Sequence, residues 1–188
     1  MVFNEDSRVK IPAILHFRRL GYTYQTKKNQ NIQRHNNIFV DIFKGAIREI
    51  NGKDYSDEQL DDAIKEIENL TENKRDKGKG FYERLKAYRD MMLVNLDEPD
   101  KNDFKVVTEL PYIGERDVRF RPDITVLING IPMAFIEAKK PNNKDGIQEE
   151  FRRMREERIC KDELIPFFNQ LQLLGFTNNQ VYNDQART

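Results

Sequence analysis

The sequence lacks the features of a disulfide-rich, zinc-binding or membrane-embedded protein. It has one cysteine among 188 residues, so an intrachain disulfide cannot form and a zinc site built from several thiolates is excluded. No segment approaches the roughly 20 apolar residues of a membrane span. The first ten residues are polar and charged, unlike a secretory signal. These absences predict a cytoplasmic protein without a membrane association.

A net charge is also lacking, because 32 Lys and Arg balance 32 Asp and Glu. A domain that held duplex DNA mainly through a broad positive field would be basic. Neutrality therefore disfavours a stand-alone, high-affinity DNA-binding protein. It leaves open a nuclease whose hold on DNA comes from elsewhere in a larger assembly.

What the chain does contain is charge and aromatic residues. Charged residues make up 34% and hydrophobic residues 38%, with twelve Phe and seven Tyr. The aromatic content is too high for a disordered chain, and the length suits one substantial domain. We expect a soluble globular domain with a modest core.

The first hundred residues show mostly helical patterns. A helix is expected over 5–20, with Ile11, Ile14 and Leu15 on its core side, followed by a polar loop over 25–37 and an apolar segment over 38–50. Ser56 and Gln59 have the spacing of a capping box, and the helix they open carries an apolar stripe (Leu60, Ile64, Ile67, Leu70). After a charged connector over 71–80, a further helix is expected over 81–96.

The pattern changes to strands near residue 104. Segments 104–112, 124–128 and 131–139 are rich in β-branched and aromatic residues, and Asn129-Gly130 is a strong hairpin signal. A charged helix is expected over 147–159, and 167–176 fits either a strand or a short helix. The fold class predicted is α/β (or α+β), a central mixed sheet flanked by helices.

Charged side chains gather at the end of this hairpin. Residues two apart in a strand share a face, so Glu137 and Lys139 project side by side. With a strict two-residue turn, Asp123 would lie opposite Ile136 and on the other face. One bulged residue, or a bend where Pro122 interrupts the strand, would set Asp123 opposite Glu137. We therefore predict an irregularity near Pro122–Asp123 or at the turn.

These three residues suit phosphodiester hydrolysis. Two adjacent carboxylates form an oxygen site for a small hard cation such as Mg²⁺, and Lys139 adds positive charge for a water or a phosphate. By spacing alone, a surface ion pair between Glu137 and Lys139 is an equally good interpretation.

The surrounding residues, RPDITVLINGIPMAFIEAKKPN at 121–142, resemble the nuclease core of the restriction (R) subunit of type I restriction–modification enzymes, in the PD-(D/E)xK nuclease superfamily. Weaker similarity lies near the start (Asn4-Glu5, Arg8, Leu20-Gly21-Tyr22) and over 146–154. The resemblance implies a restriction-endonuclease-like fold. It implies that Asp123, Glu137 and the carbonyl of Ala138 bind Mg²⁺ or Mn²⁺, and that Lys139 is the catalytic lysine.

Auxiliary residues follow less directly. Related nucleases often carry Gln-x-x-x-Tyr on the next helix; here Gln148 is present, but Arg152 replaces the tyrosine and is suited to a phosphate contact. Glu5 corresponds by the same resemblance to an acidic residue on the first helix of related nucleases, although a partner of the helix dipole is the better interpretation of it.

The resemblance also bears on the whole protein. The family includes an ATP-driven translocase, yet no G-x-x-x-x-G-K-[ST] loop is present. We therefore expect residues 1–188 to be one nuclease domain at the N-terminus of a larger subunit, with 25–100 as a helical insertion or lobe. ATP would serve the missing motor.

The expected partners are double-stranded DNA and the methylation and specificity subunits. The alternatives are a catalytically silent module of nuclease fold that binds DNA or protein, and a different nuclease of the same superfamily.

Overall fold

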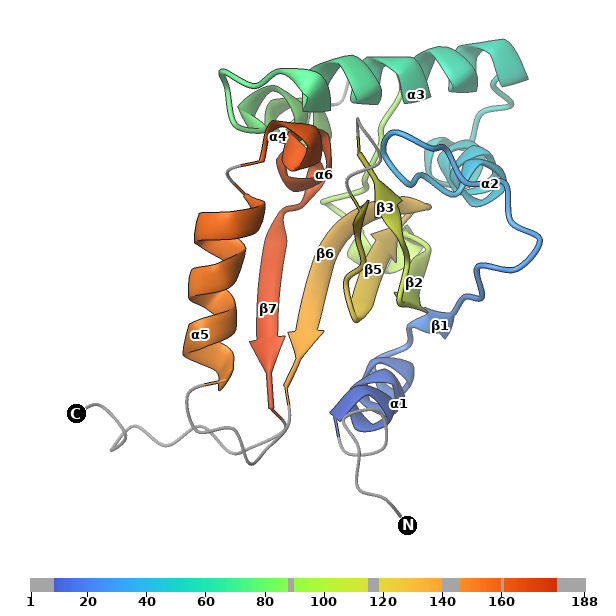
Figure 1. The fold of residues 1–188 in the computed structure, drawn as a ribbon. Helices are drawn as coiled ribbons and strands as arrows, with labels where there is room; N and C mark the ends of the chain where they lie inside the picture. The colour runs from blue at the N-terminus through green and yellow to red at the C-terminus, as the bar shows by residue number, and fades with distance from the viewer. Residues whose placement is uncertain (1–8, 88–89, 115–118, 140–145, 160, 179–188) are drawn as a thin grey trace.

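The computed structural model describes residues 9–87, 90–114, 119–139, 146–159 and 161–178. Its centre is a five-stranded sheet of order β1-β2-β5-β6-β7 (Figure 1). The strands are β1 (Thr23–Tyr24), β2 (Phe104–Thr108), β5 (Ile124–Ile128), β6 (Ile131–Ala138) and β7 (Leu173–Thr177). The outer pairs β1–β2 and β6–β7 are parallel and the inner pairs antiparallel. The predicted mixed α/β sheet is thereby confirmed.

The described residues form six α-helices around the sheet: α1 (Ile11–Arg19), α2 (Val40–Asn51), α3 (Asp57–Glu72), α4 (Lys79–Lys86), α5 (Gly146–Arg153) and α6 (Ile165–Gln170). A π-helical turn, Met154–Arg158, continues α5. Two short 3-10 turns lie at Pro99–Lys101 and Asp162–Leu164. A separate ribbon pairs β3 (Tyr112–Ile113) with β4 (Arg119–Phe120). No helix among the described residues has the length and apolarity to cross a bilayer.

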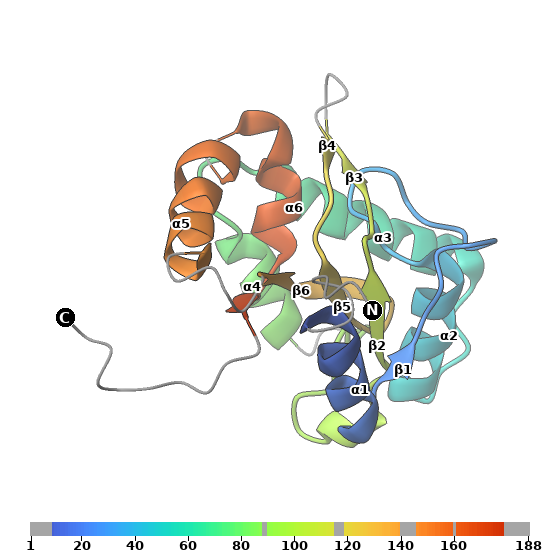
Figure 2. The same cartoon turned by 60° about the horizontal axis from the view of Figure 1, so that its bottom comes forward.

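Both faces of the sheet are covered by apolar side chains. On one face, Val106, Ile124 and Val126 pack with residues of α1 (Ala13, Ile14, Phe17). On the other, Phe135 lies in an aromatic cluster with Tyr112, Phe120 and Phe167. Figure 2 shows α1 separated from the α5–α6 pair by the sheet. The end of β6 therefore lies in a largely dry environment.

Helices α2, α3 and α4 gather at the turn end of the β5–β6 hairpin (Figure 1). The predicted capping box is present: Ser56 Oγ accepts from the Gln59 amide and Gln59 Oε1 accepts from the Ser56 amide. The predicted stripe is buried at Leu60, Ile64 and Ile67. Local sequence signals were sufficient here because a cap needs only residues three apart.

Two helix predictions need correction. The helix expected over 81–96 ends at Lys86. Beyond Lys86, side chains hold the backbone of Met91 and Met92 outside a helix. The Asn51 side chain donates to the Met92 carbonyl and accepts from the Met92 amide, and Arg84 donates to the Met91 carbonyl. In α1, Ile11 and Leu15 are more than half exposed, because the helix turns Ala13, Ile14 and Phe17 toward the sheet.

The segment 167–176 combines both structures that its pattern allowed. Helix α6 ends at Gln170 and β7 begins at Leu173. The side-chain amide of Gln170 donates to the backbone carbonyls of Asn36 and Pro132. The backbone amide of Gln172 donates to the Met133 carbonyl. These bonds place β7 beside β6.

Candidate functional site

The β5–β6 hairpin contains one bulged residue. Asn129 and Gly130 both have positive φ, 52° and 77°, as a tight two-residue turn requires. Leu127 pairs with Pro132, but Val126 pairs with Ala134, so one extra residue stands in β6. Ile124 then pairs with Ile136, which sets the preceding Asp123 opposite Glu137. The irregularity exists, but it lies mid-hairpin and not at the turn or near Pro122.

The position of the bulge has a physical cause. Pro132 has no amide to donate to the ladder, and proline in a strand is found at edges and bulges. Its carbonyl accepts from Gln170, and the neighbouring Met133 carbonyl accepts from the Gln172 amide. The extra residue is therefore held from the β7 side, and Pro132 was the sequence signal for it.

Asp123 is anchored through both of its oxygens. Oδ2 accepts from the amide of Ala138 at 2.8 Å, and Oδ1 lies 2.8 Å from Nζ of Lys10. The backbone carbonyl of Asp123 accepts from the Glu109 amide at 2.9 Å, which extends the β2–β5 ladder. The carboxylate is thus fixed against the end of β6.

Glu137 has one oxygen engaged and one without a partner. Oε1 lies 3.2 Å from Nζ of Lys139, whereas Oε2 is buried and has no hydrogen-bond donor among the described residues. Burial, and then the nearby Asp123 charge, raise the pKa of Glu137 above its ordinary value. A buried carboxylate oxygen without a donor is costly, and it is available to a cation.

Lys139 lies between two carboxylates. Besides Glu137, it contacts Oε2 of Glu150 at 3.0 Å. Burial lowers the pKa of Lys139, but the hydrogen bond that its ammonium donates to Glu150 and both carboxylate charges outweigh it, so the pKa is raised. Lys139 therefore carries its positive charge at neutral pH in the metal-free protein.

The donor atoms fit a small hard cation. The amide of Ala138 points to Asp123, and in a strand the amide and carbonyl of one residue point to the same side. The carbonyl of Ala138 therefore faces the same side of β6 as Asp123, whose charge also acts on Glu137. Carboxylate and carbonyl oxygens are the ligands that Mg²⁺ and Ca²⁺ prefer. The residues present thus fit the metal that the resemblance implies.

Helix α5 contributes a residue that sequence analysis missed. Glu150 is buried, contacts Lys139, and is itself held by the guanidinium of Arg153. Gln148 and Arg152 are exposed on the same helix, and Glu5 lies outside the described residues. The available signal was spacing, because Glu150 falls between Ile147 and Met154 on the inward stripe of α5.

A second group of potential ligands lies elsewhere. His35 brings a nitrogen within 4.8 Å of carboxylate oxygens of Glu68 and Glu72. His35 and Glu72 are exposed and Glu68 is half-buried. Spacing in the sequence did not pair His35 with any acidic residue, because the loop and α3 meet only in the folded chain.

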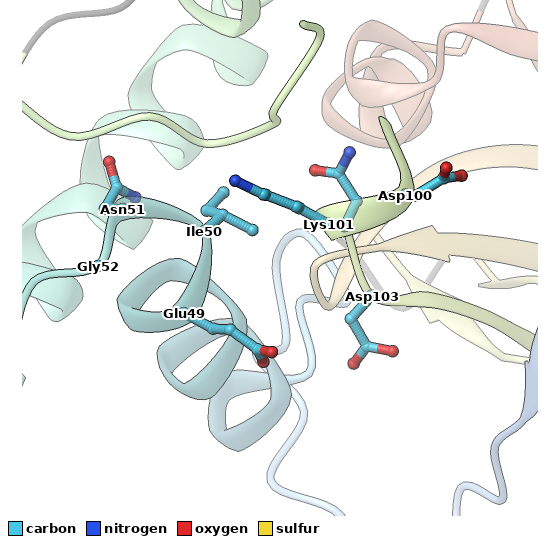
Figure 3. A pocket seen from close by; sticks show the side chains of 8 residues that line it. Glu49, Ile50, Asn51, Gly52, Asp100, Lys101 and Asp103 are labelled. Carbon is cyan, nitrogen blue, oxygen red and sulfur yellow. The ribbon is translucent and has the colours of Figure 1, made fainter. Parts of the chain in front are cut away.

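A cavity of about 770 Å³ lies at the turn end of the β5–β6 hairpin, away from Asp123 and Glu137, between α2 and the start of β2 (Figure 3). Its lining includes three carboxylates, Glu49, Asp100 and Asp103, and one ammonium, Lys101. Asp103 lies at the Ile128 end of β5, because the next residue, Phe104, pairs with Ile128. Asp123 lies at the other end of β5, directly before Ile124. This acidic cavity is separate from the carboxylate pair and unsuited to a phosphate.

Comparison with known proteins gives a consistent result. The family model described as "Type I restriction enzyme R protein N terminus" matches residues 2–185. A relative from Methanocaldococcus jannaschii, named "Putative type I restriction enzyme MjaIXP endonuclease subunit", is 31% identical over 173 aligned residues. The alignment covers 79% of this chain and 16% of that relative, so the chain spans a small part of its length.

Proposed function

Because the chain belongs to the family of type I restriction enzyme R protein N termini, we propose that it is the nuclease module of such a subunit. In this proposal it is a Mg²⁺-dependent endonuclease that hydrolyses phosphodiester bonds of double-stranded DNA. Mn²⁺ would also suit its oxygen ligands.

One observation carries the proposal: the bulged hairpin sets Asp123 against the Ala138 amide and close enough to Glu137 for the two charges to interact, and the buried Oε2 of Glu137 has no donor among the described residues. Two carboxylates this close repel each other, and burial increases the cost. Such an arrangement is expensive for stability alone, and a divalent cation relieves it. A purely structural ion pair between Glu137 and Lys139 would not require Asp123 there.

The roles follow from the geometry. Asp123, Glu137 and the carbonyl of Ala138 would hold the cation, which when bound lowers the pKa of a water and offsets charge on the phosphodiester. Lys139 stays protonated, so it supplies positive charge to the phosphate or orients the attacking water. Glu150 holds the Lys139 ammonium at the end of β6.

The proposal extends to the parent protein. ATP would be used by a motor outside this chain, and methylation and specificity subunits would choose the target. Residues 25–100, which include α2, α3 and α4, would form a helical lobe of the single nuclease domain. The net charge of zero fits a module that relies on other parts of the assembly to hold DNA.

The same neutrality favours one alternative, a catalytically silent module of nuclease fold. Metal binding separates the two functions. We expect calorimetry to detect Mg²⁺ or Mn²⁺ binding by the wild-type chain and none by Asp123→Asn. Asp103→Asn, which alters a carboxylate paired with Lys105 far from the site, should bind normally. Equal binding by the wild type and Asp123→Asn would remove the proposed ligand set.

Activity is tested in the full-length subunit. We expect Lys139→Met to abolish DNA cleavage while ATP hydrolysis continues, because the motor lies outside this chain. A Lys139→Met subunit that still restricts DNA would show the catalytic assignment to be wrong. Metal binding by the wild type together with full cleavage by this variant would point to a different catalytic residue.

A further inference from the structure

Lys10 is a cation at the proposed metal site that sequence analysis did not single out. It directly precedes α1, and its side chain is 13% exposed. Its Nζ lies 2.8 Å from Oδ1 of Asp123 and 3.3 Å from Oε1 of Glu109. Lys10 therefore bridges one proposed metal ligand and one carboxylate outside the ligand set.

The contact with Asp123 conflicts with metal binding. Oδ2 of Asp123 already accepts from the Ala138 amide, so Oδ1, the oxygen that Lys10 contacts, is the oxygen without a backbone partner and the better placed one for a cation. A Mg²⁺ ion binds oxygen at about 2.0–2.1 Å. With Lys10 unmoved, an ammonium and a divalent ion would lie within about 5 Å of each other. Their repulsion opposes joint occupancy.

Glu109 offers the ammonium a second position. It already contacts Lys10, and its side chain is 40% exposed. Its amide donates to the Asp123 carbonyl, and its φ of 50° lies in the left-handed region that side-chain-bearing residues rarely adopt. The backbone thus holds Glu109 beside Asp123, within reach of the same ammonium.

We propose that Lys10 is an exchangeable counter-ion of the metal site. Its ammonium neutralises Asp123 when no metal is bound, and it transfers to Glu109 when a divalent cation takes Oδ1. Lys10 and Glu109 together then set the metal affinity, Lys10 by competition and Glu109 by accepting the displaced charge. This inference rests on the proposed function of the site.

Calorimetric titration with Mn²⁺ tests the exchange. Removing the competitor in Lys10→Met should tighten the Kd about tenfold, within the usual range of coupling between two sites. Removing the second position in Glu109→Gln should weaken it by about threefold or more. Lys27→Met is the matched control, because Lys27 donates to the Glu109 carbonyl at 2.7 Å but does not contact Asp123; its Kd should be unchanged.

The double variant separates exchange from simple charge removal. If Glu109 acts by receiving Lys10, Glu109→Gln should change the Kd by less than about twofold in the Lys10→Met background. Equal effects of Glu109→Gln in both backgrounds would overturn the exchange. An unchanged or weaker Kd in Lys10→Met would overturn the competition.

Wild-type protein gives an independent measurement that does not depend on how the variants fold. The ¹⁵Nζ resonance of Lys10 should shift on saturation with Mg²⁺ while that of Lys27 does not; an unmoved Lys10 resonance in metal-bound protein would overturn the inference. Absence of metal binding by both wild type and Lys10→Met would instead overturn the proposed function. Asp123-dependent binding by Lys10→Met alone would support the competition.

Discussion

At the scale of single residues, the end of β6 combines groups that a stable fold would avoid. Glu137 is buried near Asp123, and one of its oxygens has no donor within the part of the chain that the structure describes. Lys139 and Lys10 offset part of the negative charge, each through a different carboxylate. Charged groups in such surroundings are common at functional sites, where stability is given up for activity.

Neutralising Glu137 should therefore stabilise the metal-free chain. Because the pKa of Glu137 is raised, the folded chain binds the proton of the Glu137 carboxyl more tightly than the unfolded chain does. Glu137 accordingly favours folding below the ordinary value of 4.5, and that contribution is lost as the pH rises through the raised pKa. At pH 7.5, Glu137→Gln should gain on the order of 1 kcal/mol in urea unfolding.

The pH dependence is the decisive part of that measurement. The gain should shrink as the pH falls toward the ordinary value, because wild-type Glu137 becomes neutral as well. Glu58→Gln, an exposed position on α3, should show no such gain at either pH. A variant less stable than wild type at pH 7.5 would contradict the assigned cause of the shift.

Glu150 is predicted to be a positioning residue for Lys139. In the full-length subunit, Glu150→Gln should lower kcat for DNA cleavage about tenfold with little change in KM, because the ammonium is no longer held. It should also move the alkaline limb of the pH–rate profile to lower pH, since Glu150 raises the pKa of Lys139. Glu149→Gln, exposed on the same helix, should behave as wild type. A purely structural role would leave the profile in place.

At the scale of elements, the hairpin decides whether the site exists. Without the bulge Asp123 would lie opposite Ile136 and on the other face of the sheet from Glu137; with it, Asp123 and Glu137 share a face. The turn of the hairpin is enclosed by α2. The Gly130 carbonyl accepts from the Phe39 amide at the start of that helix. The hairpin turn and α2 are therefore coupled.

Gly130→Ala should test the coupling. A Cβ there would lie 2.7 Å from the Phe43 nitrogen and 2.8 Å from the Phe39 carbonyl oxygen, at a φ of +77°. We expect a loss of about 2–3 kcal/mol in urea unfolding. Gly45→Ala is the control, because it lies within α2 and its Cβ would meet nothing within 4 Å. It should gain roughly 0.5–1 kcal/mol. Equal effects of the two changes would show that the turn is not enclosed as described.

At the scale of the whole molecule, the metal should contribute to stability. A ligand that binds only the folded chain stabilises it by about 2.7 kcal/mol at a concentration of 100 times its Kd. For a domain of this size, that corresponds to roughly 5–10 °C in Tm. We expect thermal unfolding with saturating Mg²⁺ to show this increase in the wild type and to show none in Asp123→Asn. The same increase in both proteins would place the bound metal elsewhere, with the His35 cluster the next candidate.

The sequence by itself determined those features that depend on near neighbours in the chain. The Ser56 capping box, the Asn129-Gly130 turn and the alternation that puts Glu137 and Lys139 on one face all involve residues within three positions of each other. The resemblance over 121–142 added the family. Each of these follows from backbone geometry, which is the same wherever the segment lies.

Only the tertiary structure decided what surrounds the carboxylates. Three separate parts of the chain supply Lys10, Glu109 and Glu150. They meet Asp123 and Lys139 because α1 and α5 pack beside the sheet and β2 pairs with β5. The bulge opposite Val126 and Leu127, likewise, is held by bonds from the segment that leads into β7. Such contacts depend on how faces of helices and strands are buried together. Local spacing marks an inward-facing residue such as Glu150, but it does not encode which residue of another element that side chain meets.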